Sequence, residues 1–87
     1  MVRSDALVPM QTGTLENLAV PGVFIAVDMS GPNGSVFRQI VGTFVTWENR
    51  PRRLVLSLPD DQAIIFIPEA LVLRGYWAPA GYRPQKG

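Results

Sequence analysis

The stretch from Val36 to Glu48 (VFRQIVGTFVTWE) constrains the fold more than any other part of the chain. It is rich in β-branched and aromatic residues, which favour strands, and it is longer than an ordinary strand. Gly42 lies near its centre, and a glycine inside a strand often marks a bulge or a tight bend. We therefore predict a long, strongly curved strand that belongs to both sides of a small barrel.

Shorter strands are predicted on both sides of this stretch, from two-residue alternation or from continuous apolar character. They are Val23–Met29, Arg52–Leu58, Ala63–Ile67 and Ala70–Leu73. Residues 30–35 (SGPNGS) are turn-forming and predict a hairpin, and Pro68-Glu69 leaves room only for a tight corner. The predicted fold class is all-β, a small five-stranded antiparallel barrel of the SH3-like kind over residues 23–76.

The two ends of the chain lack strand periodicity. Residues 1–22 are predicted to be an N-terminal arm, with at most one short helix after Thr14, which is either mobile or packs on one end of the barrel. Residues 77–87 are predicted to be a Pro- and Gly-rich tail in which Trp77 and Tyr82 are the side chains able to pack.

The composition of the chain excludes most kinds of catalytic site. The chain has no cysteine and no histidine, which excludes disulfides, thiolate or imidazole metal sites and nucleophiles activated by histidine. Its acidic residues do not have the spacing of a metal site or of a general acid/base couple. We expect no enzymatic activity, no cofactor and no metal.

Charge and hydropathy place the chain among core-forming proteins. Hydrophobic residues make up 47% and charged residues 17% of the sequence, and the formal net charge is +1. No apolar run approaches the roughly 20 residues of a membrane span, and the N-terminus does not resemble a signal peptide. We predict a cytoplasmic protein without a membrane partner.

The strand pattern resembles the Sm/LSm/Hfq superfamily of small barrels. The residues that carry the resemblance to the first Sm motif are Gly42, Phe44, Glu48 and Leu54-Val55-Leu56, and Leu73-Arg74-Gly75 is similar to the Arg-Gly of the second motif. That Arg-Gly here follows the last predicted strand, whereas in the family it lies between the fourth and fifth strands. The resemblance implies an oligomeric barrel, such as a ring, that binds single-stranded RNA or DNA.

Five residues are the candidates for a nucleic-acid interface. They are Trp47, Arg50, Arg52, Arg53 and Arg74. In this interpretation the indole stacks on a base and the guanidiniums hold phosphate. The alternative is that Trp47 is a core residue, sharing strand parity with Val41 and Val45, and that the loop arginines are solvated turn residues whose replacement leaves folding intact.

The apolar segment Ala63–Ile67 (AIIFI) is the candidate oligomer interface, with Ile64, Ile65, Phe66 and Ile67 as its contact residues. Strand alternation puts Ile64 and Phe66 on one side and Ile65 on the other. A chain of this length has little other structure with which to cover both faces and the edge of such a strand. We predict a homo-oligomer, and a second functional hypothesis follows, a protein-interaction or assembly module that does not bind nucleic acid.

A second resemblance, to the type II dihydrofolate reductases, gives a third functional hypothesis, a pore enzyme, which is less favoured. Gln39-Ile40-Val41-Gly42 and the Pro68–Leu71 corner are similar to parts of those tetrameric barrels. Their pore is built from a Val-Gln-Ile-Tyr strand, which would fall on Ile64–Ile67. That segment lacks the Gln and the Tyr, so the polar groups of a folate and nicotinamide site are missing.

Overall fold

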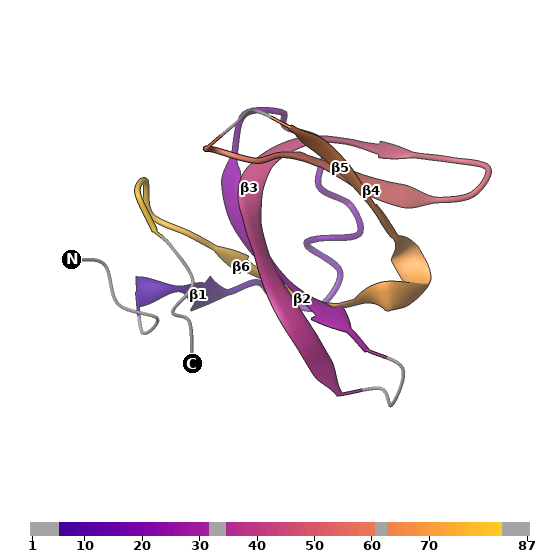
Figure 1. Cartoon of the computed structure of the whole chain (residues 1–87), viewed down its shortest axis with the longest axis horizontal. Helices are drawn as coiled ribbons and strands as arrows, with labels where there is room; N and C mark the ends of the chain where they lie inside the picture. Colours follow the sequence, from indigo (N-terminus) through magenta and orange to yellow (C-terminus); the bar gives the residue numbers. More distant parts are fainter. Residues whose placement is uncertain (1–5, 32–34, 61–62, 83–87) are drawn as a thin grey trace.

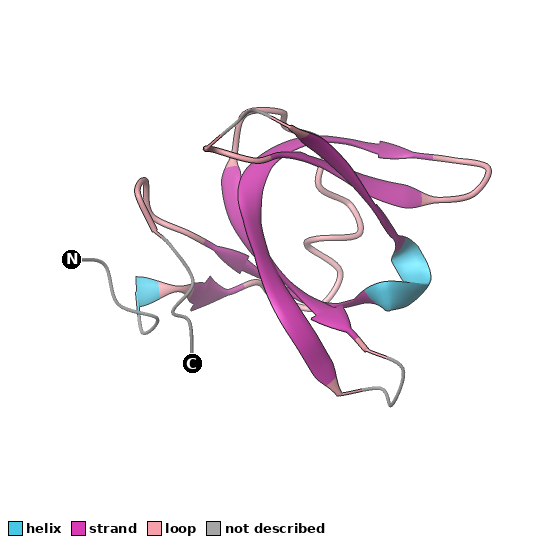
Figure 2. Ribbon diagram, in the orientation of Figure 1, coloured by secondary structure: helices cyan, strands magenta, loops and turns pink. Residues whose placement is uncertain are grey.

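The computed structural model describes residues 6–31, 35–60 and 63–82. Within these ranges the protein is all-β, without an α-helix, and one antiparallel sheet has the strand order β1-β6-β2-β3-β4-β5 (Figures 1 and 2). The strands are β1 (Val8–Pro9), β2 (Phe24–Ser30), β3 (Val36–Glu48), β4 (Arg53–Ser57), β5 (Ile64–Pro68) and β6 (Val72–Trp77). A single 3-10 turn, η2 (Glu69–Leu71), joins β5 to β6. No helix in the described ranges is long and apolar enough to cross a membrane.

Strand β3 is the longest strand and pairs with two neighbours. Its bounds are those predicted from the sequence. Its first part pairs with β2 and its last part with β4, and Thr43 is opposite both Phe24 and Ser57. Gly42 lies at this crossing, where a Cβ atom would be 2.8 Å from the carbonyl oxygen of Ser57. The strand therefore curves around the core, as Figure 1 shows, with glycine where two backbones approach most closely.

The bulge that the sequence suggested at Gly42 lies slightly later, between Phe44 and Thr46. An extra residue in one strand reverses the alternation of side chains beyond it. Trp47 consequently packs against the same core as Phe44, while Val45 is exposed. The alternative prediction, that Trp47 packs in the core, is confirmed. Its stated reason, that Trp47 lies on the same side of the strand as Val45, is wrong.

The main core lies on the concave side of the curved sheet. Alternation along β2 and β4 is confirmed, because Ile25, Val27, Leu54 and Leu56 are fully buried there. Leu15 of the N-terminal segment, 3% exposed, joins this core. The segment crosses the inside of the curve in Figure 1, so its described part packs on the sheet without forming an α-helix.

The prediction of a closed, five-stranded barrel is wrong in two respects. The sheet has a sixth strand, β1, which pairs Val8 with Trp77 and Pro9 with Tyr76, and it does not close, since β5 and β1 lie at its two ends. A two-residue strand containing a proline has no periodicity, so only its position beside β6 reveals it. The turn η2 separates β5 from β6 in the chain, and no ladder joins those two strands.

The last strand extends further than predicted. Strand β6 begins at Val72 and includes Trp77, so Arg74-Gly75 lies inside this strand instead of after it. Tyr82, 2% exposed, packs with Ala26 and Val41 on the face opposite the main core. The expectation that Trp77 and Tyr82 pack is confirmed, and both faces of the β2–β3 region are covered.

The approach of β3 to β4 gives a stability prediction. Gly42→Ala forces a methyl group against the Ser57 carbonyl, which cannot move without disturbing the ladder, and should cost about 1–3 kcal/mol in the free energy of unfolding. Gly75→Ala is the matched control, because its methyl group would meet the side chains of Met10 and Leu15, which can shift more easily. Urea denaturation measures both, and an equal or larger loss for Gly75→Ala would contradict this account.

Candidate functional site

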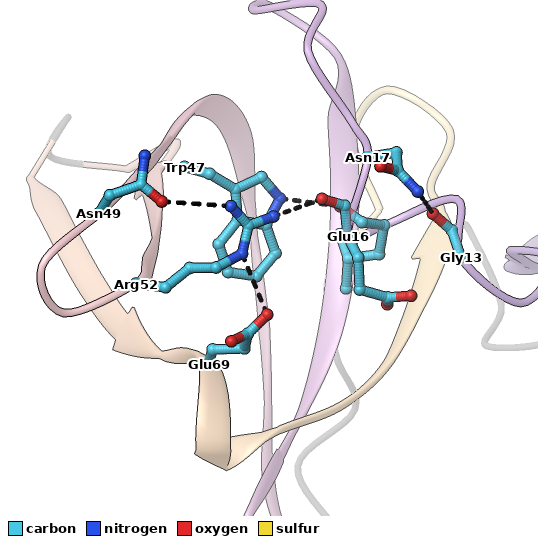
Figure 3. A network of polar contacts seen from close by, with 8 residues as sticks. Gly13, Glu16, Asn17, Trp47, Asn49, Arg52 and Glu69 are labelled. Carbon is cyan, nitrogen blue, oxygen red and sulfur yellow. Dashed lines mark hydrogen bonds and ion pairs between the residues drawn. The ribbon is translucent and has the colours of Figure 1, made fainter.

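Arg52 is the centre of a polar network that joins three segments of the chain (Figure 3). Its Nε donates to Glu69 Oε2 at 3.0 Å, and its Nη1 donates to Asn49 Oδ1 at 3.5 Å. Its Nη2 donates to the backbone carbonyl of Glu16. The guanidinium thus connects the β3–β4 loop to the η2 turn and to the N-terminal segment.

Trp47 is part of the same network. Its Nε1 donates to the carbonyl oxygen of Leu15 at 2.8 Å, and Arg52 Cζ lies 4.3 Å from the centroid of the indole ring. Figure 3 shows the guanidinium over the ring. This cation–π contact occupies one face of the indole, so a base can stack on that face only after Arg52 moves away.

Arg53 also has partners within the chain. Its Nη2 lies 2.5 Å from Glu48 Oε1, and its Cζ lies 4.7 Å from the ring centroid of Phe66. Its Nε is buried and has no hydrogen-bond partner among the described residues. Arg53 therefore lies over the exposed phenylalanine of β5 at the start of β4, with 39% of its own side chain exposed.

The remaining candidate arginines are separate from this cluster. Arg50 is exposed in the β3–β4 loop, and Arg74 is exposed on β6, directly opposite Asp28 of β2. The structure therefore brings Trp47 and Arg52 together, and it places Arg53 in separate contacts with Glu48 and Phe66. Arg50 and Arg74 are exposed, while Arg52 and Arg53 are partly buried.

Strand β5 presents two large apolar side chains to solvent. Ile64 is 49% and Phe66 is 47% exposed, while Ile65 is partly buried against the core and Ile67 is 2% exposed. The predicted alternation of Ile64 and Phe66 against Ile65 is confirmed. Ile67 lies in the core of its own chain, so its side chain is not on the surface that a second protein would meet.

The outer edge of β5 carries open backbone groups. Leu58 N–H donates to the Ala63 carbonyl at 2.8 Å and Glu69 N–H to the Arg52 carbonyl at 3.1 Å, so the odd-numbered residues of this stretch face β4. Because backbone groups alternate along a strand, those of Ile64, Phe66 and Pro68 point to the other side. No strand in the described part of the chain pairs with that side.

A second polar group, on the face opposite the main core, was missed by the sequence reasoning. Asp28, 8% exposed, accepts a hydrogen bond from Tyr76 Oη at 2.7 Å and another from Gln39 Nε2 at 3.1 Å. Tyr82 Oη donates to Gln39 Oε1 at 3.0 Å. The signal in the sequence was an aspartate inside the otherwise apolar VFIAVDM, but the other members of the group come from three other segments.

The two tyrosines of this group have shifted ionisation. Burial raises the pKa of Tyr76, and the hydrogen bond to Asp28 raises it further, while Arg74 acts in the opposite direction. Burial also raises the pKa of Tyr82, with a contribution from the negative charge of Asp28. Both phenols are therefore held in their neutral, hydrogen-bonding form.

Neither polar group resembles a catalytic or metal centre. Within the described ranges, no group of three or more acidic, histidine or cysteine side chains is placed to hold a metal ion. The carboxylates of Glu48, Glu69 and Asp28 each accept hydrogen bonds from neighbouring side chains. Their arrangement stabilises loops and strands and offers no pair of free carboxylates for acid/base work.

Comparison with known proteins gives no assignment. No family model, curated protein or solved structure matches the chain. The geometry of the chain itself is therefore the basis for inferring its function.

The Arg52 network gives a second prediction. Arg52→Ala removes three hydrogen bonds and the contact with Trp47, and should lower the free energy of unfolding by about 1–3 kcal/mol. The matched control is Arg50→Ala in the same loop, which should change stability by less than about 0.5 kcal/mol. Both values come from urea denaturation. Equal stability of the two variants would show that the network contributes nothing.

A third prediction concerns alkaline pH. Unfolded tyrosines ionise near pH 10 and these folded ones at higher pH, so above about pH 10 the folded state binds more protons and stability falls as pH rises. Tyr82→Phe should lose about 1 kcal/mol at neutral pH, through its hydrogen bond to Gln39, and should show a smaller alkaline decline. Urea midpoints measured from neutral pH to about pH 11 test this, and an unchanged decline would contradict it.

Proposed function

We propose that the protein is a non-catalytic assembly module that associates with itself through β5. The observation that carries the proposal is the open edge of this strand, with Ile64 and Phe66 exposed beside it. An edge strand with free backbone groups is a template for pairing with another chain, and soluble proteins usually protect such edges with charges, bulges or covering segments. Between Ile64 and Ile67 this strand has no charged residue.

The energetics favour association over exposure. Fully burying a side chain such as Ile64 or Phe66 stabilises by about 1.5–3 kcal/mol, and folded domains have a total stability of only about 5–15 kcal/mol. Two such side chains on one strand are therefore a substantial driving force. Pairing would also satisfy the backbone N–H and C=O groups at the edge.

The architecture supports a relation to the SH3-like, Sm-type barrels at the level of fold. The supporting features are the central strand order β6-β2-β3-β4-β5, the long bent β3 with Gly42, and the single η2 corner. In this proposal β1 and the N-terminal segment are additions to such a fold. Because small barrels carry many unrelated functions, the likeness supports the architecture and not a ligand.

Assembly is favoured here over nucleic-acid binding. Arg52 and Arg53 already hold Glu69 and Glu48, and Trp47 has one face covered, so an RNA or DNA strand would have to displace these contacts. The net charge of +1 gives little long-range attraction for phosphate. Among the five candidates Arg50 and Arg74 are the most exposed, while Trp47, Arg52 and Arg53 are partly buried.

The test of assembly places a charge on the β5 surface. Phe66→Lys should shift the protein toward monomer in sedimentation velocity, because the buried contact would then require desolvation of an ammonium group. Val20→Lys is the control, since Val20 is exposed and lies outside β5, and it should sediment as the wild type does. Circular dichroism should show that both variants remain folded.

Two outcomes would overturn the proposal. A wild-type protein that is monomeric at micromolar concentration would remove self-association as its role. The second outcome is that the wild type changes the electrophoretic mobility of single-stranded RNA or DNA in a salt-sensitive way, while the Arg50→Ala/Arg74→Ala double variant does not. Nucleic-acid binding would then replace assembly as the function.

A further inference from the structure

We propose that two copies pair β5 to β5 about a two-fold axis, with Ile64 of each copy opposite Phe66 of the other and the two Ile65 residues facing each other. This inference rests on the proposed self-association and specifies its geometry. Its consequence is a closed dimer with one continuous sheet, in contrast to the head-to-tail ring that the Sm resemblance implies.

At the other end of the sheet, the outer edge of β6 is already covered by its own chain. Strand β1 pairs with Tyr76 and Trp77, and Met10 N–H donates to the Gly75 carbonyl at 3.0 Å. Beyond Met10 the N-terminal segment stays beside β6, where it lines a cavity together with Leu73 and Arg74. The outer edge of β6 is therefore covered from Gly75 to Trp77.

The free edge of β1 is as poor a pairing partner for β5 of a second copy as the edge of β6 is. It is two residues long and one of them is Pro9, which has no N–H to donate. A head-to-tail assembly would have to attach the longer edge of β5 to one of these short edges. The extended edge that each copy has to offer is β5 itself.

The outer edge of β5 is complementary to the same edge of a second copy. Its outward groups are the N–H and C=O of Ile64 and Phe66 and the C=O of Pro68. When Ile64 faces Phe66 of the second copy in antiparallel pairing, each of the two symmetry-related pairs exchanges both of its hydrogen bonds. All the outward donors from Ile64 to Pro68 are then used, and Pro68 lies just beyond these pairs.

The neighbouring register is poorer for a definite reason. If Phe66 faced Phe66, Ile64 would face Pro68 of the second copy. Because Pro68 has no N–H, the Ile64 carbonyl would then lack its donor. The proline thus disfavours the register centred on Phe66 relative to the one centred on Ile65.

The side chains fit this register. On the convex face each exposed Ile64 would meet the exposed Phe66 of the other copy, a β-branched and aromatic pair of the kind that stabilises cross-strand contacts. Arg53 already lies over the Phe66 ring, which limits the positions that the ring can adopt. On the concave face the two partly buried Ile65 side chains would meet at the axis.

Disulfide crosslinking tests the geometry directly, because the chain has no cysteine of its own. At the axis the two Ile65 residues form a non-hydrogen-bonded pair with Cα atoms about 4.5 Å apart, within the range that a disulfide bridges. Ile65→Cys should therefore oxidise to a covalent dimer and no larger species. At micromolar protein it should do so about a hundredfold faster than Val20→Cys, the exposed control outside β5.

A second pair of variants guards against loss of folding at the partly buried Ile65. Ile64→Cys and Phe66→Cys are at exposed positions, and oxidation of their mixture should give chiefly the mixed dimer. A predominant Phe66→Cys homodimer would instead indicate the register that the proposal excludes. Reducing and non-reducing gels with intact mass measurement distinguish the products.

The outcomes separate this inference from the proposed function. If the wild type self-associates but Leu73→Cys crosslinks with the β5 variants, the assembly is head-to-tail and the two-fold dimer is wrong while the assembly role stands. If no β5 variant crosslinks faster than Val20→Cys, the two-fold dimer is likewise wrong. If the wild type sediments as a monomer, both proposals fail together.

Discussion

The close approach of β3 to β4 at Gly42 is the constraint on which the rest of the structure depends. There β3 passes from pairing with β2 to pairing with β4, and no side chain fits between the Gly42 backbone and the Ser57 carbonyl. The resulting curve lets one sheet surround a core on its concave side. Because the chain is short, this curvature substitutes for a second layer, and Leu15 of the N-terminal segment completes the filling.

The basic loop after β3 illustrates how a binding motif in sequence becomes a structural element. Arg52 holds the N-terminal segment and the η2 turn to the sheet, and the indole of Trp47 lies beneath it. The Arg53–Glu48 pair covers part of Phe66. The same arginine and aromatic composition would be expected of a nucleic-acid interface, but these guanidiniums already contact carboxylate and carbonyl groups of their own chain. The unused surface lies instead at β5.

The all-β, antiparallel character that the Sm-type resemblance implies is present, but the sheet has six strands and does not close into a barrel. The relation to Sm-type barrels itself stays a prediction. The added β1 and the segment that follows it cover most of the β6 edge, which is where a head-to-tail neighbour would dock. A small addition at one end of a sheet can therefore change which assembly its free edges permit.

Local patterns in the sequence were sufficient for the strand class, the bounds of β3, the buried alternation of Ile25 and Val27, and the placing of Ile64 and Phe66 on the side of β5 opposite Ile65, because these depend on residue type and a period of two. The tertiary structure decided the rest. The bulge after Phe44 reversed the parity that would have placed Trp47 with Val45, and β1 exists only because β6 offers it an edge. The partners of Arg52 and Asp28 come from segments far away in the chain, so contact between them depends on how the sheet curves and not on any local pattern.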